Sequence, residues 1–394
     1  MSSTTTVTIP TQEESFTKLE LVTAQGPVYR MVSSKSPRNA RPDEVPIIDL
    51  HGIHGDLQAR KELAQEIGNA AKNYGFFYIK NHGIPHETVN NAREAALQFF
   101  GQPAEEKAKV AESESKYSNG WSAARTRKVS PTESAGKLRP DPRTFSCFFV
   151  CSPFAYEPVD VKEGFIWSYD PANDPDSKDA SAIPDSVKSA LHCEDFIWEG
   201  TRHLPGFRDS IINYWKECVM LSRSLVRIFA LALDLPEEVF DELVTYPGSD
   251  GAINYYPAMK PGSEGSDGQP QEVGLGSHTD LQCFTLLWQD QVGGLQVLSK
   301  SGQWLCVPPV EGTLVVNIGD YLMRLTNDRF VSNVHRVVGR APIDRLSMPF
   351  FFGFNFNETV AVLPSCVDED HPAKYEPISC GDVSDNPRIS RNGT

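Results

Sequence analysis

Hydrophobic side chains recur at three- and four-residue steps in three stretches of the chain, and this period is typical of amphipathic helices. Leu63, Ile67, Ala70 and Ala71 give that spacing to residues 58–74. Similar patterns run over 86–101 and, over a longer stretch, 205–234. We therefore predict helices over these ranges and a further short helix over 236–244. Short apolar runs at 45–50 and 76–79 predict strands.

Beyond residue 251 the pattern changes to short apolar runs separated by turn residues. The number and spacing of these runs predict an eight-stranded barrel or jelly roll. The expected strands cover 252–256, 274–279, 283–289, 294–298, 303–307, 313–318, 330–338 and 345–354. The fold class that we predict is therefore an all-β jelly-roll core with flanking helices (α+β).

This pattern divides the chain into four segments. Residues 1–44 are largely polar and predict a loose N-terminal arm, either free or packed at its end. Residues 45–250 predict a helix-rich region, within which 113–200 is rich in Ser, Lys, Asp and Pro and predicts a long irregular loop. Residues 251–356 form the expected jelly-roll core, and 357–394 a polar C-terminal extension.

Charge and composition exclude several classes of partner. The 394 residues carry 37 Lys and Arg against 52 Asp and Glu, a formal net charge of −15. Such a surface repels nucleic-acid phosphates and anionic lipids, and no apolar run approaches the roughly 20 residues that span a bilayer. We therefore expect neither partner. The N-terminal residues do not resemble a signal peptide, so we expect a cytoplasmic protein whose eight cysteines are reduced. No pattern indicates an oligomeric state.

The candidate metal ligands are His278, Asp280 and His335. On a strand, residues two apart point the same way, so His278 and Asp280 share a face. His335 comes from a later predicted strand, which can face the first across a barrel. Two histidines and one carboxylate on one side of a metal suit Fe(II) that binds a cosubstrate and dioxygen together. The remaining seven histidines lack a carboxylate in this strand arrangement and are interpreted as structural or surface residues.

A second candidate constellation is Arg345 and Ser347, which also share one face of a predicted strand. A guanidinium can hold a carboxylate through two hydrogen bonds, and a hydroxyl can add a third. A surface arginine paired with Asp344 is the alternative. We favour the carboxylate site because Arg345 follows His335 closely and opens an apolar strand. Tyr256, and also Asn254, can reach the same ligand, although Tyr255 and Tyr256 are equally compatible with ordinary strand aromatics.

Several sequence motifs resemble the iron(II)- and 2-oxoglutarate-dependent oxygenases of the isopenicillin-N-synthase-like branch. They are Asn-Tyr-Tyr-Pro at 254–257, Gly-Ser-His-Thr-Asp at 276–280, Gly-Gly-Leu-Gln-Val-Leu at 293–298, Val-Val-Asn-Ile-Gly-Asp at 315–320, Val-His-Arg-Val at 334–337 and Arg-Leu-Ser at 345–347. Residues 45–50 and 75–84 resemble the N-terminal region of the same branch.

This resemblance implies a double-stranded β-helix that binds Fe(II) and uses dioxygen and 2-oxoglutarate, with ascorbate as a candidate reductant. It implies that Arg345 and Ser347 anchor 2-oxoglutarate, helped by Tyr256 and Asn254. The expected reaction is hydroxylation, desaturation or ring formation, with release of succinate and carbon dioxide. One alternative is an iron oxidase that needs no 2-oxoglutarate, in which Arg345 and Ser347 bind the substrate's own carboxylate. The other is a catalytically silent binding module.

The expected substrate is a small specialised metabolite, an interpretation that also comes from the resemblance. Aromatic side chains can line an apolar pocket. Our candidates are Tyr117, Phe154, Phe352 and Phe354, with Trp121 and Trp167 as further possibilities, and most of them are equally compatible with core packing. The segment 113–200 and the glycine-rich insertion at 262–271 do not match the family pattern.

Overall fold

The computed structural model describes residues 14–23, 26–126, 160–177, 183–258, 273–338 and 343–384. The predicted substrate residue Phe154 and the insertion at 262–271 lie outside these ranges. None of the helices in the described ranges is long and apolar enough to cross a membrane.

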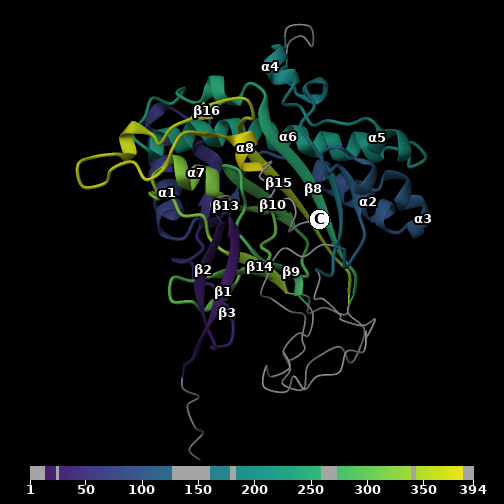
Figure 1. Ribbon diagram of the computed structural model, residues 1–394, viewed down its shortest axis with the longest axis horizontal. Coiled ribbons are helices and arrows are strands. Elements are labelled where there is room, and N and C mark those ends of the chain that lie inside the picture. The colour runs from purple at the N-terminus through teal and green to yellow at the C-terminus, as the bar shows by residue number, and fades with distance from the viewer. Residues whose placement is uncertain are drawn as a thin grey trace, which may run out of the picture.

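Two facing β-sheets form the core of the described chain, which confirms the predicted double-stranded β-helix (Figure 1). The larger sheet has eight strands in the order β4 (Ile47–Asp49), β5 (Phe76–Lys80), β13 (Thr313–Ile318), β10 (Phe284–Gln289), β15 (Arg345–Asn355), β8 (Pro247–Tyr256), β7 (Glu163–Trp167) and β6 (Gly120–Ser122). The smaller sheet has five, in the order β3 (Arg38–Asn39), β12 (Trp304–Cys306), β11 (Leu295–Leu298), β14 (His335–Val338) and β9 (Val273–His278).

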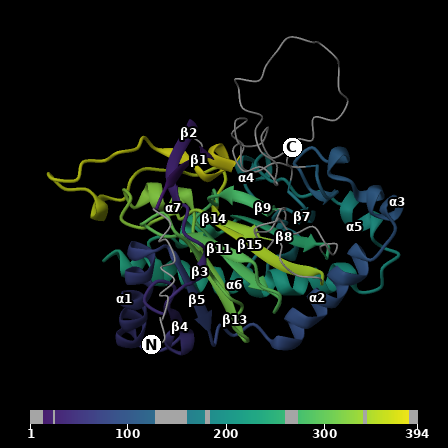
Figure 2. The ribbon, with the colours of Figure 1, turned by 90° about the horizontal axis from the view of Figure 1, so that it is seen from below.

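Three long helices lie on the side of the larger sheet that faces away from the smaller one (Figures 1 and 2). They are α1 (Leu57–Asn73), α2 (His86–Phe100) and α6 (Phe207–Ala232), close to the predicted ranges. Asp56 caps α1 by accepting a hydrogen bond from the Ala59 amide at 2.9 Å. Gly75 ends this segment with a φ of +65°, and a Cβ there would lie 1.8 Å from the Val331 carbonyl oxygen. Only glycine therefore allows the turn from α1 into β5.

Successive side chains on a strand point to opposite faces of the sheet. On β15, one face packs against the helices and the other faces the interior between the two sheets. Phe350, Phe352 and Phe354 of β15 belong to the apolar cluster shared with the helices. Residues of opposite parity on the same strand, including Arg345, Ser347 and Phe351, face the interior between the two sheets. A separate group between the sheets packs the inner side chains Phe76, Tyr78, Leu295, Val297, Leu305 and Val315 together.

The N-terminal segment differs from the predicted loose arm. β1 (Phe16–Thr23) and β2 (Gly26–Ser33) pair as an antiparallel hairpin. Leu19 and Leu21 are buried against Leu298 and Trp304 of the smaller sheet and against Val334, the residue before β14. The two leucines are two residues apart, which is the spacing expected of a strand. The segment as a whole is polar, so this pattern was overlooked.

Two other predictions were wrong in part. Within 113–200, β6 and β7 extend the larger sheet, so this region is not wholly irregular. The helix predicted over 236–244 is instead a series of turns ending in a 3-10 helix at Asp241–Val244. Its carbonyl groups bind side chains: Asn355 donates to Glu242 O at 3.0 Å and Arg223 to Val244 O at 3.1 Å. Those contacts replace the hydrogen bonds of a regular helix.

The remaining elements are short and lie around the two sheets. A helix that the sequence pattern did not predict, α7 (Asp320–Leu325), follows β13. The C-terminal extension forms β16, β17 and α8, which brings the buried Cys380 against β15. The short elements are α3 (Ala104–Lys107), α4 (Asp185–Lys188), α5 (Phe196–Gly200), α8 (Cys380–Ser384), strands β16 (Thr359–Val360) and β17 (Ile378–Ser379), and 3-10 helices at Leu50–Gly52, Ala108–Val110, Glu112–Glu114, Pro171–Asn173 and Pro364–Cys366.

Substitutions on the two faces of β15 should lower the free energy of unfolding by different amounts. Phe352→Ala removes a fully buried ring that contacts Phe284, and should lower the free energy of unfolding by about 3–5 kcal/mol. Phe351→Ala, at a half-buried position on the interior face, should cost clearly less. Urea unfolding of both variants measures the difference. A larger loss for Phe351→Ala would contradict the assignment of the faces.

Candidate metal centre and cosubstrate site

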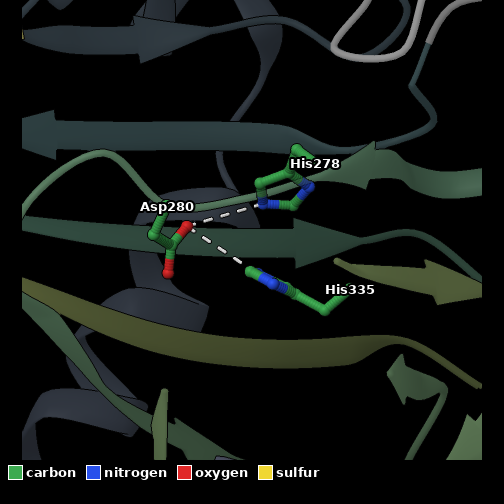
Figure 3. Close-up of side chains that lie close together, drawn as sticks. All are labelled: His278, Asp280 and His335. Carbon is green, nitrogen blue, oxygen red and sulfur yellow. Dashed lines mark ion pairs between the residues drawn. The ribbon is translucent and has the colours of Figure 1, made fainter. Parts of the chain in front are cut away.

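The structure brings His278, Asp280 and His335 together at one end of the smaller sheet (Figure 3). His278 ends β9 and His335 begins β14, and these two residues are direct partners in the antiparallel pairing. The Nε2 atom of each histidine lies 3.7 Å from Asp280 Oδ1. Each of the three side chains offers one ligand atom, and these three atoms lie within 4.8 Å of one another.

Backbone contacts fix the direction of both imidazoles. His278 Nδ1 lies 2.7 Å from Gly276 O, and His335 Nδ1 lies 3.2 Å from Asn333 O. A carbonyl oxygen only accepts hydrogen bonds, so the proton sits on Nδ1 in each ring. The lone pair of each Nε2 is thus free, and both are directed at the space beside Asp280. Histidine ligands of metal sites are commonly oriented in this way.

The second carboxylate oxygen of Asp280 is held by two residues that the sequence pattern did not single out. Asn317 Nδ2 donates to Oδ2 at 2.7 Å, and the Thr285 hydroxyl donates to the same atom. Thr285 on β10 and Asn317 on β13 are cross-strand partners. Each is a polar residue between two apolar neighbours on its strand, and that is the signal that could have identified them. Their hydrogen bonds leave Oδ1 to face the two imidazoles.

The protonation states also suit a metal. Burial lowers the pKa of His278 to about 4, and repulsion from His335 adds to this effect. Burial alone would raise the pKa of Asp280, but the two imidazoles and the hydrogen bonds from Thr285 and Asn317 outweigh it and lower the pKa. At neutral pH the site therefore presents a neutral His278 and an ionised Asp280, the forms that bind metals. Two imidazole nitrogens and one carboxylate oxygen fit Fe(II) with positions left for other ligands.

Arg345 is buried on the interior face of the larger sheet, where it is 4% exposed. Its Nε donates to Gly293 O, its Nη1 to Ser347 Oγ at 3.1 Å, and its Nη2 lies 3.4 Å from Gln289 Oε1. All these acceptors are neutral, and no carboxylate of the described chain forms an ion pair with Arg345. The alternative pairing with Asp344 is not observed, because Asp344 accepts from the Tyr255 hydroxyl at 2.6 Å. A buried cation without a countercharge fits an anionic ligand.

Tyr256 and Asn254 lie beside this arginine through strand pairing. Arg345 is the partner of Tyr256, and Ser347 is the partner of Asn254. The guanidinium carbon of Arg345 lies 4.7 Å from the centre of the Tyr256 ring. The Tyr256 hydroxyl is buried and has no hydrogen-bond partner in the described chain. These features complete a cradle that fits the far carboxylate of 2-oxoglutarate.

Asn254 has a further partner that the sequence pattern did not indicate. Lys162, just before β7, donates from Nζ to Asn254 Oδ1 at 2.7 Å. An ammonium group only donates, so the oxygen of the Asn254 amide faces the lysine. The amide nitrogen is then the group that can donate to a ligand.

The predicted substrate residues within the described ranges are not gathered at the site. Phe352 and Phe354 lie on the helix side of β15, packed against Phe284 and Phe240 respectively, so their predicted role in the pocket is wrong. The physical reason is strand alternation. Phe352 and Phe354 are an odd number of residues from Arg345 and Ser347, so their side chains point to the opposite face of β15. Tyr117 is 43% exposed and stacks on His192 with ring centres 4.5 Å apart. Of the further aromatic candidates, Trp167 belongs to the apolar cluster of the helices and Trp121 donates to Glu163 at 2.7 Å.

Comparison with known protein families gives two matches. Residues 45–187 match the family described as non-haem dioxygenase in morphine synthesis N-terminal. Residues 250–354 match the 2OG-Fe(II) oxygenase superfamily. The N-terminal hairpin lies outside both matches.

Individual relatives agree with these families. The 2-oxoglutarate-Fe(II) type oxidoreductase ppzC of Metarhizium rileyi is 41% identical over 93% of this chain and 92% of its own. The 2-oxoglutarate-Fe(II) type oxidoreductase hxnY of Emericella nidulans is 31% identical over 87% of this chain and 88% of its own.

A solved structure extends the likeness to three dimensions. The crystal structure of a full-length Neurospora crassa protein in complex with alpha-KG and 5-formyluracil aligns with a TM-score of 0.67 at 26% identity, covering 91% of this chain and 100% of that one. A buried histidine–aspartate–histidine cluster, a barrel of this topology and relatives of this identity and coverage all agree. The chain belongs to the 2OG-Fe(II) oxygenase superfamily and is an Fe(II)- and 2-oxoglutarate-dependent oxygenase.

Proposed function

We propose that this enzyme oxidises a small specialised metabolite by hydroxylation, desaturation or ring formation, with release of succinate and carbon dioxide. The observation that carries the proposal is the placement of two sites on one barrel interior. His278, Asp280 and His335 converge on one point, while Arg345 is buried on the facing sheet and forms no ion pair with a carboxylate of the described residues.

In this proposal His278, Asp280 and His335 hold Fe(II), which when bound supplies the redox chemistry that couples decarboxylation of 2-oxoglutarate to oxidation of the substrate. Arg345 and Ser347 hold the far carboxylate of 2-oxoglutarate, and Tyr256 donates its buried hydroxyl to the same group. Asn254 is oriented by Lys162 so that its amide nitrogen can donate to the cosubstrate. These residues bind, orient and neutralise charge in a site that burial keeps largely dry.

Two observations support a small-molecule substrate. The matched Neurospora crassa structures hold 5-formyluracil or thymine beside alpha-KG. The interior faces of β7 and β8 also carry small or apolar residues, Gly164, Ile166 and Ala252, which suit contact with a small organic molecule.

The direct test of this function is substrate-triggered turnover. Enzyme loaded with Fe(II), 2-oxoglutarate and ascorbate should release succinate faster when a true substrate is added. The product, followed by mass spectrometry, should have gained one oxygen or lost two hydrogens. Oxidation of a substrate at the same rate without 2-oxoglutarate would instead support the oxidase alternative, in which Arg345 and Ser347 bind the substrate's own carboxylate.

Substitution of the anchoring arginine tests the cosubstrate site. Arg345→Lys keeps the charge but loses the planar fork that binds Ser347, Gln289 and a carboxylate together. The KM for 2-oxoglutarate should rise by about tenfold or more, as expected for lost charge-assisted hydrogen bonds. Arg227→Lys, which alters a surface pair with Asp241, is the matched control and should leave that KM unchanged. A normal KM in Arg345→Lys would remove the arginine from this role.

The hydrogen bonds behind Asp280 give a third prediction. Thr285→Val nearly preserves shape but removes the hydroxyl that holds Oδ2. Affinity for Fe(II) should fall by about 10–100-fold, as for other residues that orient metal ligands. Thr313→Val is the control, because that hydroxyl donates to Val310 O instead. Competition with a coloured chelator under anaerobic conditions measures both affinities, and equal values would show that Thr285 does not position Asp280.

A further inference from the structure

The interior face of β8 carries a carboxyl group, Asp250, that neither the metal cluster nor the cosubstrate cradle uses. Strand alternation places Asp250 on the same face as Asn254 and Tyr256. Asp250 is the cross-strand partner of Phe351, and Phe351 is the partner of Thr285. Thr285 in turn holds Asp280. Asp250 and Phe351 therefore lie in the row of interior residues at the level of the metal ligands.

The surroundings of Asp250 stabilise its charge only in part. Gln282 donates to Asp250 Oδ2 at 3.2 Å, but no donor of the described chain completes a hydrogen bond to the buried Oδ1. Ser168, just after β7, interacts with Asp250 but also donates to Asn119 Oδ1 at 3.0 Å. No lysine or arginine of the described chain forms an ion pair with this carboxyl. A buried acceptor in this condition is costly, and the cost falls when a ligand supplies a donor.

The pKa of Asp250 also favours a ligand that carries a positive charge. Burial raises the pKa of Asp250 to about 6, although His192, Ser168, Gln282 and the Tyr169 amide oppose the shift. A ligand cation beside the carboxyl would compensate for the desolvation that causes this shift. The neighbouring Gln282 is in a similar condition. Its Oε1 is buried and accepts no hydrogen bond from the described chain. Two neighbouring side chains therefore lack hydrogen-bond donors at the level of the metal ligands.

We propose that Asp250 is a substrate-specificity residue that binds a protonated amine or another N–H-bearing nitrogen of the substrate, with the ring of Phe351 beside it. This inference rests on the proposed function and narrows its substrate class to nitrogenous molecules. An ionised carboxylate only accepts hydrogen bonds and repels anions, while an aromatic ring attracts a cation on its face. The nitrogen would thus fix which carbon of the substrate lies nearest the metal ligands.

The test compares two small probes that differ in the nitrogen. Benzylammonium and benzyl alcohol share a ring and are close in size. Their dissociation constants are measured by calorimetry under anaerobic conditions on the Fe(II)- and 2-oxoglutarate-loaded enzyme, its Asp250→Asn variant and the control Asp344→Asn. Asp344 binds the Tyr255 hydroxyl and the Ala258 amide, so it carries a similar charge in a different setting.

The wild-type enzyme and Asp344→Asn should bind benzylammonium at least about tenfold more tightly than benzyl alcohol, as expected for a charge-assisted hydrogen bond. Asp250→Asn should lose that preference while its affinity for benzyl alcohol stays the same. Equal preference in all three proteins, or no preference in the wild type, overturns the proposal.

Two further measurements separate this inference from failure of the fold or of the proposed function. An unchanged dissociation constant for 2-oxoglutarate in Asp250→Asn shows that the barrel is intact, and Asp250→Ser provides a second variant should the first not fold. Probe binding does not require turnover, so a wild-type enzyme that selects benzylammonium but never releases succinate would refute the proposed function alone.

Discussion

The pairing of β9 with β14 places His335 directly opposite His278, and the candidate metal centre depends on this register. A shift of one residue would turn one imidazole to the other side of the sheet. The register is fixed from both directions. Apolar side chains of the smaller sheet pack against the larger sheet on one side, while the N-terminal hairpin covers Val334, the residue before His335. The hairpin thus stabilises the segment that presents a ligand, although it lies outside the family matches.

The larger sheet contributes the rest of the site through its interior face. Thr285 and Asn317 from adjacent strands hold one oxygen of Asp280, and further along β15 and β8 lie the residues of the arginine cradle. The other face of the same strands is a continuous apolar surface packed against α1, α2 and α6. Rigid packing on that face is what allows polar groups to be held on the interior face at fixed distances.

The sequence predicted those parts of the site that depend on local spacing. His278 and Asp280 are two residues apart on one strand, as are Arg345 and Ser347, so strand alternation alone places each pair on one face. The long helices followed from their apolar period. The parts that depend on contacts between distant strands were not predicted. Thr285, Asn317, Lys162 and Asp250 acquire their places only through sheet register, which short motifs do not encode.

One error could have been avoided from the sequence. Phe352 and Phe354 differ in parity from Arg345, so the alternation that identified the arginine also placed both rings on the opposite face. Phe351 is the aromatic residue of that strand on the interior face. The hairpin over residues 16–33 was missed because the polarity of the whole arm outweighed the alternating leucines within it.

The most direct test of the account is an anaerobic titration of the Fe(II)-loaded enzyme with 2-oxoglutarate, followed by visible absorption. A weak metal-to-ligand charge-transfer band in the wild-type protein, and its absence from Asp280→Ala, is the predicted result. It would show that the keto acid chelates an iron held by His278, Asp280 and His335. Absence of the band in wild-type protein that demonstrably holds iron, or its persistence in Asp280→Ala, would contradict the account.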